Sequence, residues 1–482
     1  MKKNALIFVF DKTGIVDFSQ GLRNCGYELT VHADVAEILH RSAIDGFTTI
    51  SNDDFFNIDL EPFEIIVVNT QSFAQWFTSE HPLSVDKIID VAFDAQIEFI
   101  KNLAKNYRNN SVLIDPLDYD NAIQSLNEYG KITDTLKIMF VCKVFEYVAH
   151  IDTLIATCLR KKQQNNDFPR FFTVTYEKSQ GLRYGENPHQ AASYYKEAMT
   201  NEGTLADAEQ LSGSDLSFNN INDSNIAISL LKEFTQPAAV AVKHANPCGV
   251  SISDTILEAF NKAYDADSIS AFDSVVALNR EVDLELATRI CHIFTGLVIA
   301  PQYTSEALSL LKQNQQKIKV LQIKKLTEIV SPNENDMRKV LGGLLIQKTD
   351  SKIFEKENIK CITKRTPTEY EMRQLEFAWI VAKHTKCNAI VLASNNATVG
   401  VGPGQMNRIT ALNIAIERGE GKTKGSVMAS DGFFFQDCVI AASKAGVTAI
   451  IQPGGSNDSD LVEECDKTDI SMLVTGMRHF KH

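Results

Sequence analysis

Short apolar runs alternate with helical segments along most of the chain, and this alternation limits the possible folds more than any other feature. In the first third, Ala5–Phe10, Phe63–Val68 and Val112–Ile114 are predicted strands, while Ile15–Asn24 and Ala95–Lys105 carry apolar residues at helical spacing. Strands joined by helices pair in parallel, because a crossover is needed to return the chain to the same end of the sheet. We therefore predict an α/β fold.

A polar stretch at 161–167 interrupts this alternation. It follows a long predicted helix, roughly Leu136 to Arg160, and its sequence offers no apolar side chain to a core. We therefore predict three regions: an α/β domain at 1–130, a helical connector at 131–167 and a larger α/β domain at 168–482. The larger domain has predicted strands at Ala238–Val242, Ser274–Leu278, Leu297–Ala300, Asn388–Ala393, Val447–Gln452 and Ser471–Val474, and predicted helices at Asp254–Asp265, Leu284–Phe294, Glu369–Lys386 and Gln405–Glu417.

The composition argues against several classes of protein. The formal net charge is −13, so the surface repels phosphate backbones and non-specific binding to nucleic acid is not expected. We expect no membrane span, since eighteen apolar residues never run together, and no signal peptide. The nine cysteines form no Cys-x-x-Cys pair, which argues against a zinc site or a disulfide framework and favours the reducing cytoplasm.

Residues 241–249, Ala-Val-Lys-His-Ala-Asn-Pro-Cys-Gly, are the strongest candidate for a catalytic segment. A buried strand is predicted to end in Lys243 and His244, and Asn-Pro-Cys-Gly predicts a tight turn. Ligands of open α/β sheets bind at the carboxyl ends of strands. A histidine there can act as a general base near neutral pH, and a lysine can stabilise an oxyanion or protonate a leaving nitrogen. Taken alone, the Lys-His pair fits incidental charges on a solvated loop better than it fits a catalytic site.

Other segments with the composition of binding loops favour the catalytic interpretation. Residues 181–190 combine Arg-Tyr with two turn signals, which suits a phosphate or purine clamp, and residues 216–223 are rich in amides. Residues 400–408 predict a glycine-rich turn that opens a helix, where anions bind. Residues 429–437 place aromatic side chains between carboxylates, and the chain ends in two histidines, an arginine and a lysine after a predicted strand.

These segments together resemble a known family. RYGENPHQ, LSFNN, KHANPCG, NAIVLA, GVGPGQMNR, ASDGFF, IIQPGGS and RHFKH occur in family order and cover essentially all of residues 170–482. They are similar to the bifunctional purine-biosynthesis enzymes that combine aminoimidazole-carboxamide ribonucleotide (AICAR) formyltransferase with inosine-monophosphate (IMP) cyclohydrolase. The resemblance implies an N-terminal methylglyoxal-synthase-like doubly wound domain and a C-terminal pair of cytidine-deaminase-like α/β subdomains. It also implies AICAR and 10-formyltetrahydrofolate as substrates, no metal, and a homodimer with active sites at the subunit interface.

The resemblance assigns roles residue by residue. His244 would accept the proton of the weakly nucleophilic 5-amino group of AICAR as this group attacks the formyl carbon. The implied catalytic set is Lys243, His244, Asn388, Asp437 and His482. The implied nucleotide-binding set is Arg183, Tyr184, Asn219, Arg408, Phe433 and Arg478.

Three positions in this domain depart from the family pattern. The family's Phe-Phe-Pro-Phe-Arg-Asp is shortened to Phe-Phe-Phe-Gln-Asp at 433–437. The family's glycine after Ala-Phe is Asp273, and the acid that precedes the family's Ile-Ile-Ala-Pro is Gly296. The first and third changes fall in folate and nucleotide contacts, and Asp273 is expected to crowd the purine, so slow turnover or an altered substrate is expected.

The N-terminal third departs further. Its opening, residues 9–15, matches the cyclohydrolase domain, but the family's Ser-Thr-Gly-Gly-Thr phosphate loop is replaced by Thr-Val-His-Ala-Asp at 30–34. The family's Lys-Thr-Leu-His-Pro is missing between Asp54 and Glu61, and its tyrosine is Gln71. Of the cyclohydrolase residues, Asp94 and Lys105 are retained. We therefore predict that IMP cyclohydrolase activity is lost or severely reduced.

Two other hypotheses remain at this point. A zinc-dependent deaminase would place ligands at His244 and Cys248, but such enzymes need His-x-Glu and Pro-Cys-x-x-Cys, and Cys248 is followed by Gly-Val-Ser. A catalytically silent, nucleotide-binding homologue would explain the altered pockets. The retained acid–base residues argue against it, because a silent protein has no use for them.

Overall fold

The computed structural model describes residues 3–51, 58–69, 84–92, 95–163, 168–199, 202–293, 295–314, 318–328, 335–456 and 458–482. The chain forms two compact units, the first comprising Met1–Glu177 and Lys196–Met199, the second Lys178–Tyr195 and Thr200–His482. The division falls later than the predicted boundary at 167/168. It runs through a hairpin of β6 (Tyr176–Leu182) and β7 (Ala192–Glu197), and the chain after β7 returns to the first unit, where Met199 packs beside Cys158.

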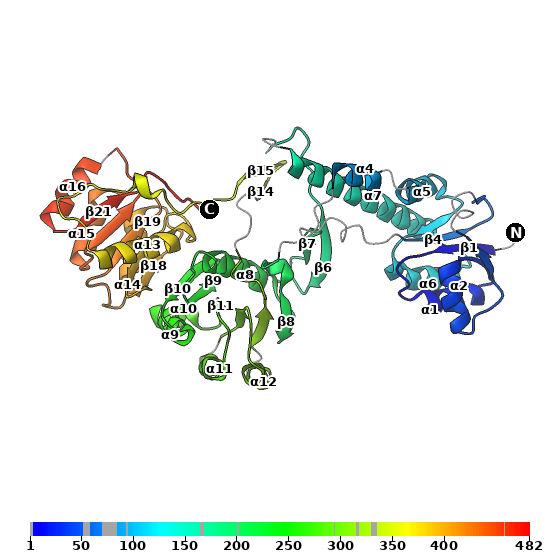
Figure 1. The fold of residues 1–482 in the computed structure, drawn as a ribbon, viewed down its shortest axis with the longest axis horizontal. Helices are drawn as coiled ribbons and strands as arrows, with labels where there is room; N and C mark the ends of the chain where they lie inside the picture. The colour runs from blue at the N-terminus through cyan, green and yellow to red at the C-terminus, as the bar shows by residue number, and fades with distance from the viewer. Residues whose placement is uncertain are drawn as a thin grey trace. The chain divides into compact units, whose positions relative to one another are not determined.

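The first unit is a parallel sheet of five strands in the order β3-β2-β1-β4-β5 (Figure 1). Alternate residues of β1 face opposite sides: Ala5 and Ile7 join one apolar cluster, and Leu6 and Phe8 join another. Helices therefore cover both faces, as the doubly wound prediction requires. The strands are β1 Lys3–Phe8, β2 Tyr27–His32, β3 Thr48–Ile50, β4 Ile65–Val68 and β5 Ser111–Leu113, and the helices are α1 Ile15–Asn24, α2 Ala33–Arg41, α4 Val85–Ala92, α5 Ala95–Leu103, α6 Tyr119–Tyr129 and α7 Asp134–Lys162.

The predicted connector helix, α7, is part of the first unit's core. Phe140 is buried in the cluster on one face of the sheet, and Val144 is buried in the cluster on the other. Further along, Val148, Ile151 and Leu154 form a third cluster with α4 and α5. The helix is therefore a packed layer of this unit.

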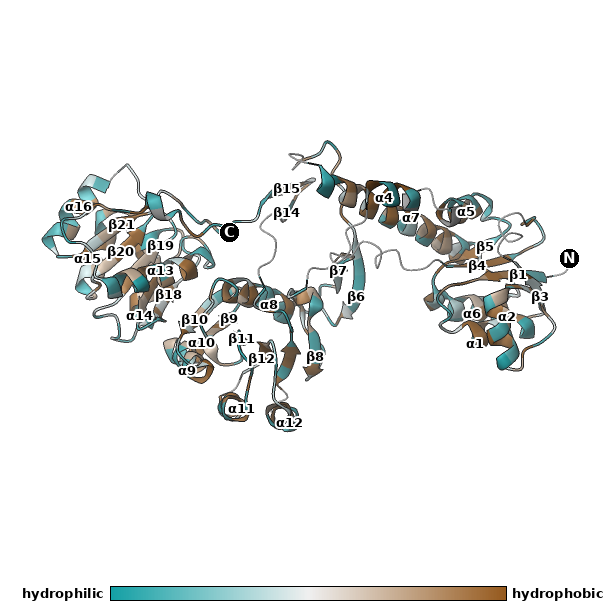
Figure 2. Ribbon diagram, in the orientation of Figure 1, coloured by the Kyte–Doolittle hydropathy of each residue, from teal (hydrophilic) through white to brown (hydrophobic). Residues whose placement is uncertain are grey.

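The second unit is built on a mixed sheet of twelve strands in the order β16-β21-β20-β19-β17-β18-β10-β9-β11-β12-β13-β8. A separate hairpin, β14 (Asn335–Val340) with β15 (Gly343–Lys348), leaves Leu341 and Leu345 exposed at its tip. Figure 2 shows β1 and β4, the central strands of the first unit, coloured as hydrophobic, whereas the exposed strand β6 is coloured as hydrophilic. The remaining strands are β8 Glu209–Ser212, β9 Ala238–Lys243, β10 Asn246–Ile252, β11 Val275–Leu278, β12 Leu297–Ala300, β13 Lys319–Gln322, β16 Lys360–Cys361, β17 Ile390–Ser394, β18 Ala397–Gly402, β19 Val427–Ser430, β20 Ala449–Gln452 and β21 Ser471–Val474, and the helices are α8 Phe218–Leu231, α9 Ile256–Ala266, α10 Ser268–Ala271, α11 Leu284–His292, α12 Ser305–Gln313, α13 Glu369–Lys383, α14 Arg408–Arg418, α15 Gln436–Lys444 and α16 Asp458–Lys467.

This large sheet repeats itself about the pairing of β10 with β18. Outward from that pair, the order β10-β9-β11-β12-β13 matches β18-β17-β19-β20-β21 in direction and in connecting helices. Each half carries a glycine four residues after its hairpin turn. A Cβ atom on Gly249 would lie 1.9 Å from the carbonyl oxygen of Ala263, and one on Gly400 would lie 1.9 Å from that of Ala415. Glycine is therefore required at both positions, because α9 and α14 touch the strand backbone there.

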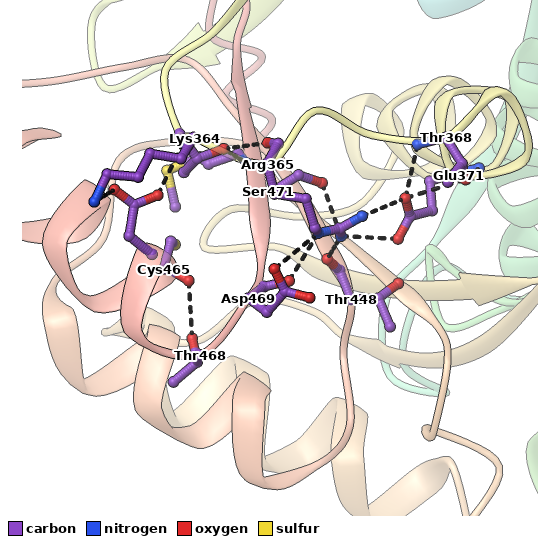
Figure 3. A network of polar contacts seen from close by, with 12 residues as sticks. Lys364, Arg365, Thr368, Glu371, Thr448, Cys465, Thr468, Asp469 and Ser471 are labelled. Carbon is purple, nitrogen blue, oxygen red and sulfur yellow. Dashed lines mark hydrogen bonds and ion pairs between the residues drawn. The ribbon is translucent and has the colours of Figure 1, made fainter.

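A partly buried ion pair fixes α13 to the sheet (Figure 3). The guanidinium of Arg365 donates to both carboxylate oxygens of Glu371, at 2.9 and 3.0 Å, to the carbonyl of Asp469 and to the hydroxyl of Ser471. Burial by itself raises the pKa of Glu371, but hydrogen bonds from Arg365 and Thr448 outweigh it and lower the pKa to about 2, from an ordinary value of 4.5. The fold therefore binds the ionised carboxylate preferentially.

The pKa of Glu371 gives a prediction for stability against pH. Since the folded pKa lies below the ordinary value, this stabilisation is complete above about pH 5 and is lost as the pH falls toward 2. At pH 7, Glu371→Gln should lower the free energy of unfolding of the second unit by about 2 kcal/mol, because it removes a charged hydrogen-bond acceptor. Thermal melting at pH 7 and pH 3.5 measures both effects. The matched control is Glu355→Gln in the exposed pair with Lys352, which should leave the melting temperature unchanged at both pH values; an equal shift in the two variants would contradict the prediction.

Candidate active site

A cavity of about 200 Å³ brings two of the predicted segments together. Lys243 and His244 line it at the end of β9, and Gly400, Val401 and Pro403 line it from β18 and the turn that follows. The cavity lies where the two halves of the large sheet meet. The remaining lining residues are Asn246, Pro247, Cys248, Ala266, Asp267, Ser270 and Arg418.

The local structure of the Lys-His segment differs from the prediction. The chain turns at His244 and Ala245, which have φ of 53° and 63°, and Lys243 pairs with Asn246 across the hairpin. Asn-Pro-Cys-Gly is the beginning of β10 and not a turn. Proline and glycine mark a β-bulge there, between Pro247 and Gly249, as they commonly do inside strands. In addition, β9 is antiparallel to both of its neighbours, so the cavity lies at the carboxyl end of an antiparallel strand.

The glycine-rich segment also differs from the prediction. Gly400 and Gly402 lie in β18, and α14 begins only at Arg408. The two glycines allow the backbones of β18 and α14 to touch, since a Cβ on Gly402 would lie 1.8 Å from the carbonyl oxygen of Ala411. They do not form an anion-binding loop. The segment nevertheless contributes one wall of the cavity.

The opposite wall contains an ion pair that the sequence did not reveal. Arg418 donates to the carboxylate of Asp267 and, at 2.8 Å, to the hydroxyl of Ser270. Asp267 also caps α10, accepting from the Ser270 amide at 2.9 Å. These residues come from the ends of three helices, and no motif connects them in the sequence.

Two of the departures from the family pattern occupy the same space. The ammonium of Lys243 donates to the carbonyl of Phe272, next to Asp273, whose φ is 53°. A Cβ atom on Gly296 would lie 2.5 Å from Oδ1 of Asp273. The carboxylate of Asp273 therefore fills the space into which a side chain at position 296 would extend.

Asn388 lies at a junction of three segments. Its backbone amide and its Nδ2 both donate to the carbonyl of Gln405, at 3.2 and 2.7 Å. The preceding residues, Lys386 and Cys387, donate from their amides to Oδ1 of Asn246 and to the carbonyl of Lys481. The segment 386–388, just before β17, thus ties the Lys-His hairpin, the segment after β18 and the C-terminal tail to one another.

The C-terminal tail gathers three predicted residues around Phe480. The guanidinium carbons of Arg408 and Arg478 lie 5.7 and 4.7 Å from the centre of its ring, and the ring of His482 lies 6.0 Å away. Arg408 also pairs with the fully buried Asp431 at 3.1 Å. These four residues form a basic and aromatic group of the kind that suits a phosphorylated ligand.

Buried contacts hold this tail in place. His479 is 2% exposed, and its two ring nitrogens face Oδ2 of Asp350 at 2.6 Å and the carbonyl of Ile353 at 2.8 Å. The neighbouring Lys481 has its pKa lowered by burial and by the charge of Lys383. Unlike a frayed terminus, the tail is therefore anchored on both sides of Phe480.

A charged cluster joins the helices of the two halves of the large sheet. Glu233, after α8, accepts from Lys383 at 2.7 Å and contacts Nε2 of His384 at 2.9 Å. Burial by itself raises the pKa of Glu233, but hydrogen bonds and charges of His384 and Lys383 lower it to about 2. Burial lowers the pKa of His384 to about 4, so its ring is neutral at pH 7. At pH 7 the cluster therefore pairs the carboxylate of Glu233 with the ammonium of Lys383.

The remaining predicted residues lie on the surface. Phe433 is exposed and contacts Phe435 edge-on, and Asp437 is exposed in the first turn of α15. Arg183 packs on Tyr184 with its guanidinium carbon 5.8 Å from the ring, and Asn219 is exposed at the start of α8. None of these five lines the cavity. In the first unit, Lys105 is exposed, while Asp54, Gln71 and Asp94 lie outside the described residues.

The structure describes no group of three or more metal-ligating side chains in the ranges given above. All nine cysteines carry free thiols, and burial raises the pKa of Cys248 to about 12. No described helix is long and apolar enough to cross a membrane.

Comparisons with known proteins agree with the resemblance seen in the sequence. The family model "AICARFT/IMPCHase bienzyme" matches residues 103–418. The bifunctional purine biosynthesis proteins PurH of Ruminiclostridium cellulolyticum, Acetivibrio thermocellus and Bacillus cytotoxicus are 42%, 41% and 40% identical, each over the whole of both chains. The crystal structure of ForH overlaps 33% of the chain at 15% identity and a TM-score of 0.26, which is too low to inform the fold. With identity at this level over its full length, the chain belongs to the AICARFT/IMPCHase bienzyme family.

Proposed function

We propose that the Lys243–His244 hairpin is where this enzyme transfers the formyl group of 10-formyltetrahydrofolate to the 5-amino group of AICAR. The observation that carries the proposal is the shared cavity, in which a histidine, a lysine and the wall of β18 meet. Family membership makes the chain a formyltransferase of purine biosynthesis. It does not favour a catalytically silent homologue.

The chemistry follows from the two side chains. The ring of His244 accepts the proton of the 5-amino group as its nitrogen attacks the formyl carbon. The ammonium of Lys243, oriented by the carbonyl of Phe272, stabilises the negative oxygen that develops on that carbon. The folate nitrogen then takes up the proton held by His244 as its C–N bond breaks, tetrahydrofolate leaves, and the formyl group remains on AICAR. Formyl transfer by these two side chains needs no metal.

The basic group around Phe480 is the proposed site of the nucleotide phosphate. Arg408 and Arg478 supply two guanidinium groups there, and Phe433 and Tyr184 are proposed to contact the ring systems of the substrates. Asn388 is proposed to contact the reacting amide, and Asp437 the folate. His482, at the end of the anchored tail, is proposed to support His244.

A second copy of the chain is proposed to complete the site. A cavity of about 200 Å³ is smaller than a site for a nucleotide and a folate. Arg183, Tyr184 and Asn219 do not line it, and the apolar tip of the β14–β15 hairpin is exposed. A homodimer with interface active sites accounts for these observations.

We also propose the finer fold of the two units and a weak cyclohydrolase. The repeated halves of the large sheet are proposed to be cytidine-deaminase-like subdomains, and the first unit methylglyoxal-synthase-like. In that unit β2 passes into α2 with no residue between them, and Asp34 stands in the first turn of the helix. A phosphate loop is therefore not formed at 30–34, and the acid repels a phosphate. This supports reduced ring closure to IMP.

One assay tests both proposals. The full-length protein is incubated with AICAR and 10-formyltetrahydrofolate, tetrahydrofolate release is followed, and formyl-AICAR is separated from IMP. We expect tetrahydrofolate release with accumulation of formyl-AICAR. Release with IMP as the main product would contradict the weak cyclohydrolase, and AICAR binding without release would contradict formyl transfer.

A further inference from the structure

We propose that Asp223 is a positioning residue for formyl transfer, holding the Lys243–His244 hairpin in the shape that the reaction requires. The inference deepens the proposed function and rests on it. Asp223 is the last residue of the amide-rich segment 216–223, to which the resemblance assigned only Asn219.

The contacts of Asp223 are directed at the turn itself. Its side chain is on α8 and the residue is 9% exposed. Oδ2 accepts from the backbone amide of His244 at 3.1 Å, and Oδ1 accepts from that of Ala245 at 2.8 Å. One carboxylate thus binds the two successive amides of a two-residue turn. Hydrogen bonds to an ionised acceptor are the stronger kind.

The turn needs such support because its residues are poorly suited to its backbone. His244 and Ala245 both have φ in the left-handed region, at 53° and 63°. Two-residue hairpin turns of this kind favour asparagine, aspartate or glycine, so Ala245 in particular adopts a conformation that its residue type seldom adopts. A carboxylate on a neighbouring helix, accepting from both turn amides, stabilises this left-handed backbone conformation.

The corresponding turn in the second half of the sheet has the same backbone conformation but carries no proposed catalytic residue. Between β17 and β18, Asn395 and Asn396 have φ of 54° and 58°, and both are residues that enter this region readily. Gln374 stands on α13 where Asp223 stands on α8, each as the sixth residue of its helix. Its Oε1 accepts from the Asn396 amide at 2.7 Å. The Asn395 amide donates to the hydroxyl of Tyr370 at 2.9 Å, so two neutral side chains bind the amides of this turn. A single carboxylate binds both amides where the turn carries His244.

This repeat supplies a matched control for the experiment. Asp223→Ala removes the support of the His244 turn, Asp223→Asn keeps one acceptor oxygen of two, and Gln374→Ala makes the corresponding truncation at the second turn. Each variant is assayed as the full chain for kcat and for KM with AICAR and 10-formyltetrahydrofolate, and its melting temperature is measured. His244→Asn is assayed in parallel.

The expected result is a loss of kcat confined to the first turn. Misplacing the catalytic pair should lower kcat by about 100-fold in Asp223→Ala and about 10-fold in Asp223→Asn, with both KM values within about threefold of wild type. Gln374→Ala should lower the melting temperature and leave kcat within about twofold of wild type, since its contacts lie away from the reacting groups.

The outcomes separate this inference from the proposed function. Asp223→Asn or Asp223→Ala with wild-type kcat, when His244→Asn is inactive, would overturn the role of Asp223 alone. An equal loss of kcat in Gln374→Ala and Asp223→Ala would also overturn it, because the role would then be structural. Full activity in His244→Asn would refute the proposed function itself. If Asp223→Ala does not fold, Asp223→Asn decides the question.

Discussion

Replacement of His244 by asparagine should lower kcat for formyl transfer by about a thousandfold, with KM for AICAR little changed. General base catalysis by a positioned histidine contributes about 10²–10⁴-fold, and asparagine cannot accept the proton of the 5-amino group. Asparagine is chosen because the backbone at this position has a φ of 53°, which asparagine adopts readily. The variant therefore removes the imidazole without forcing the turn open. Initial rates of tetrahydrofolate release at saturating substrates measure the effect.

His292→Asn is the matched control for this change. His292 lies in the last turn of α11, where its Nδ1 contacts the carbonyl of Thr288, and it does not line the cavity. The control should keep the wild-type rate. A His244→Asn variant with kcat within tenfold of wild type would show that another group accepts the proton, whatever the control does.

Substitutions at 273 and 296 should lower kcat/KM for formyl transfer, each by a large factor. When the two substitutions are combined, their effects on kcat/KM should be strongly non-additive. Gly296→Asp places a side chain against Asp273, since its Cβ would lie 2.5 Å from Oδ1, and it adds a second carboxylate at the same place. We expect kcat/KM to fall by about 100-fold, because crowding and like-charge repulsion displace Asp273. Asp273→Gly removes the single acid and should lower kcat/KM by about 10-fold or more.

The double variant tests whether the two positions act as one. Asp273→Gly combined with Gly296→Asp restores a single carboxylate, and kcat/KM should return to within about fivefold of wild type. Asp273→Gly also relieves a φ of 53°, so its melting temperature should not fall while its activity does. Steady-state kinetics and thermal melting of all four proteins complete the cycle. If the fold-loss of kcat/KM in the double variant equals the product of the two single-variant losses, the two residues act independently. That result would contradict the inference that they share one position.

Much of the fold could be predicted from local patterns. The helix at 15–24 and the strands at 297–300 and 471–474 were placed at their observed bounds, because each is a complete apolar pattern between clear breaks. β2 was missed, although Tyr27, Leu29 and Val31 alternate with polar residues as a half-buried strand should. Residues 30–34, at the end of this strand, align with a phosphate loop of the family, and that alignment obscured the strand pattern.

Glycine and proline were the main source of error. In 246–249 and 400–402 they indicated turns, but both segments are strands, with a bulge in the first and a helix packed on the backbone in each. A glycine that permits a left-handed turn and a glycine that permits close approach have the same local sequence signature. Only the position of α9 and α14 distinguishes them.

The sequence by itself determined the α/β class, the order of most elements and the family, because these depend on residue type and on periodicities of a few residues. It also supplied the candidate side chains for the proposed chemistry. The tertiary structure alone decided which of those side chains meet. It placed Lys243 and His244 against β18, gathered Arg408, Arg478 and His482 around Phe480, and set Asp273 against Gly296. It also placed Asp223 against the backbone amides of His244 and Ala245, although Asp223 lies 21 residues from His244 in the chain and no sequence motif connects the two. Such pairings depend on how helices pack on a sheet whose halves are joined through β10 and β18, and no local pattern specifies that packing.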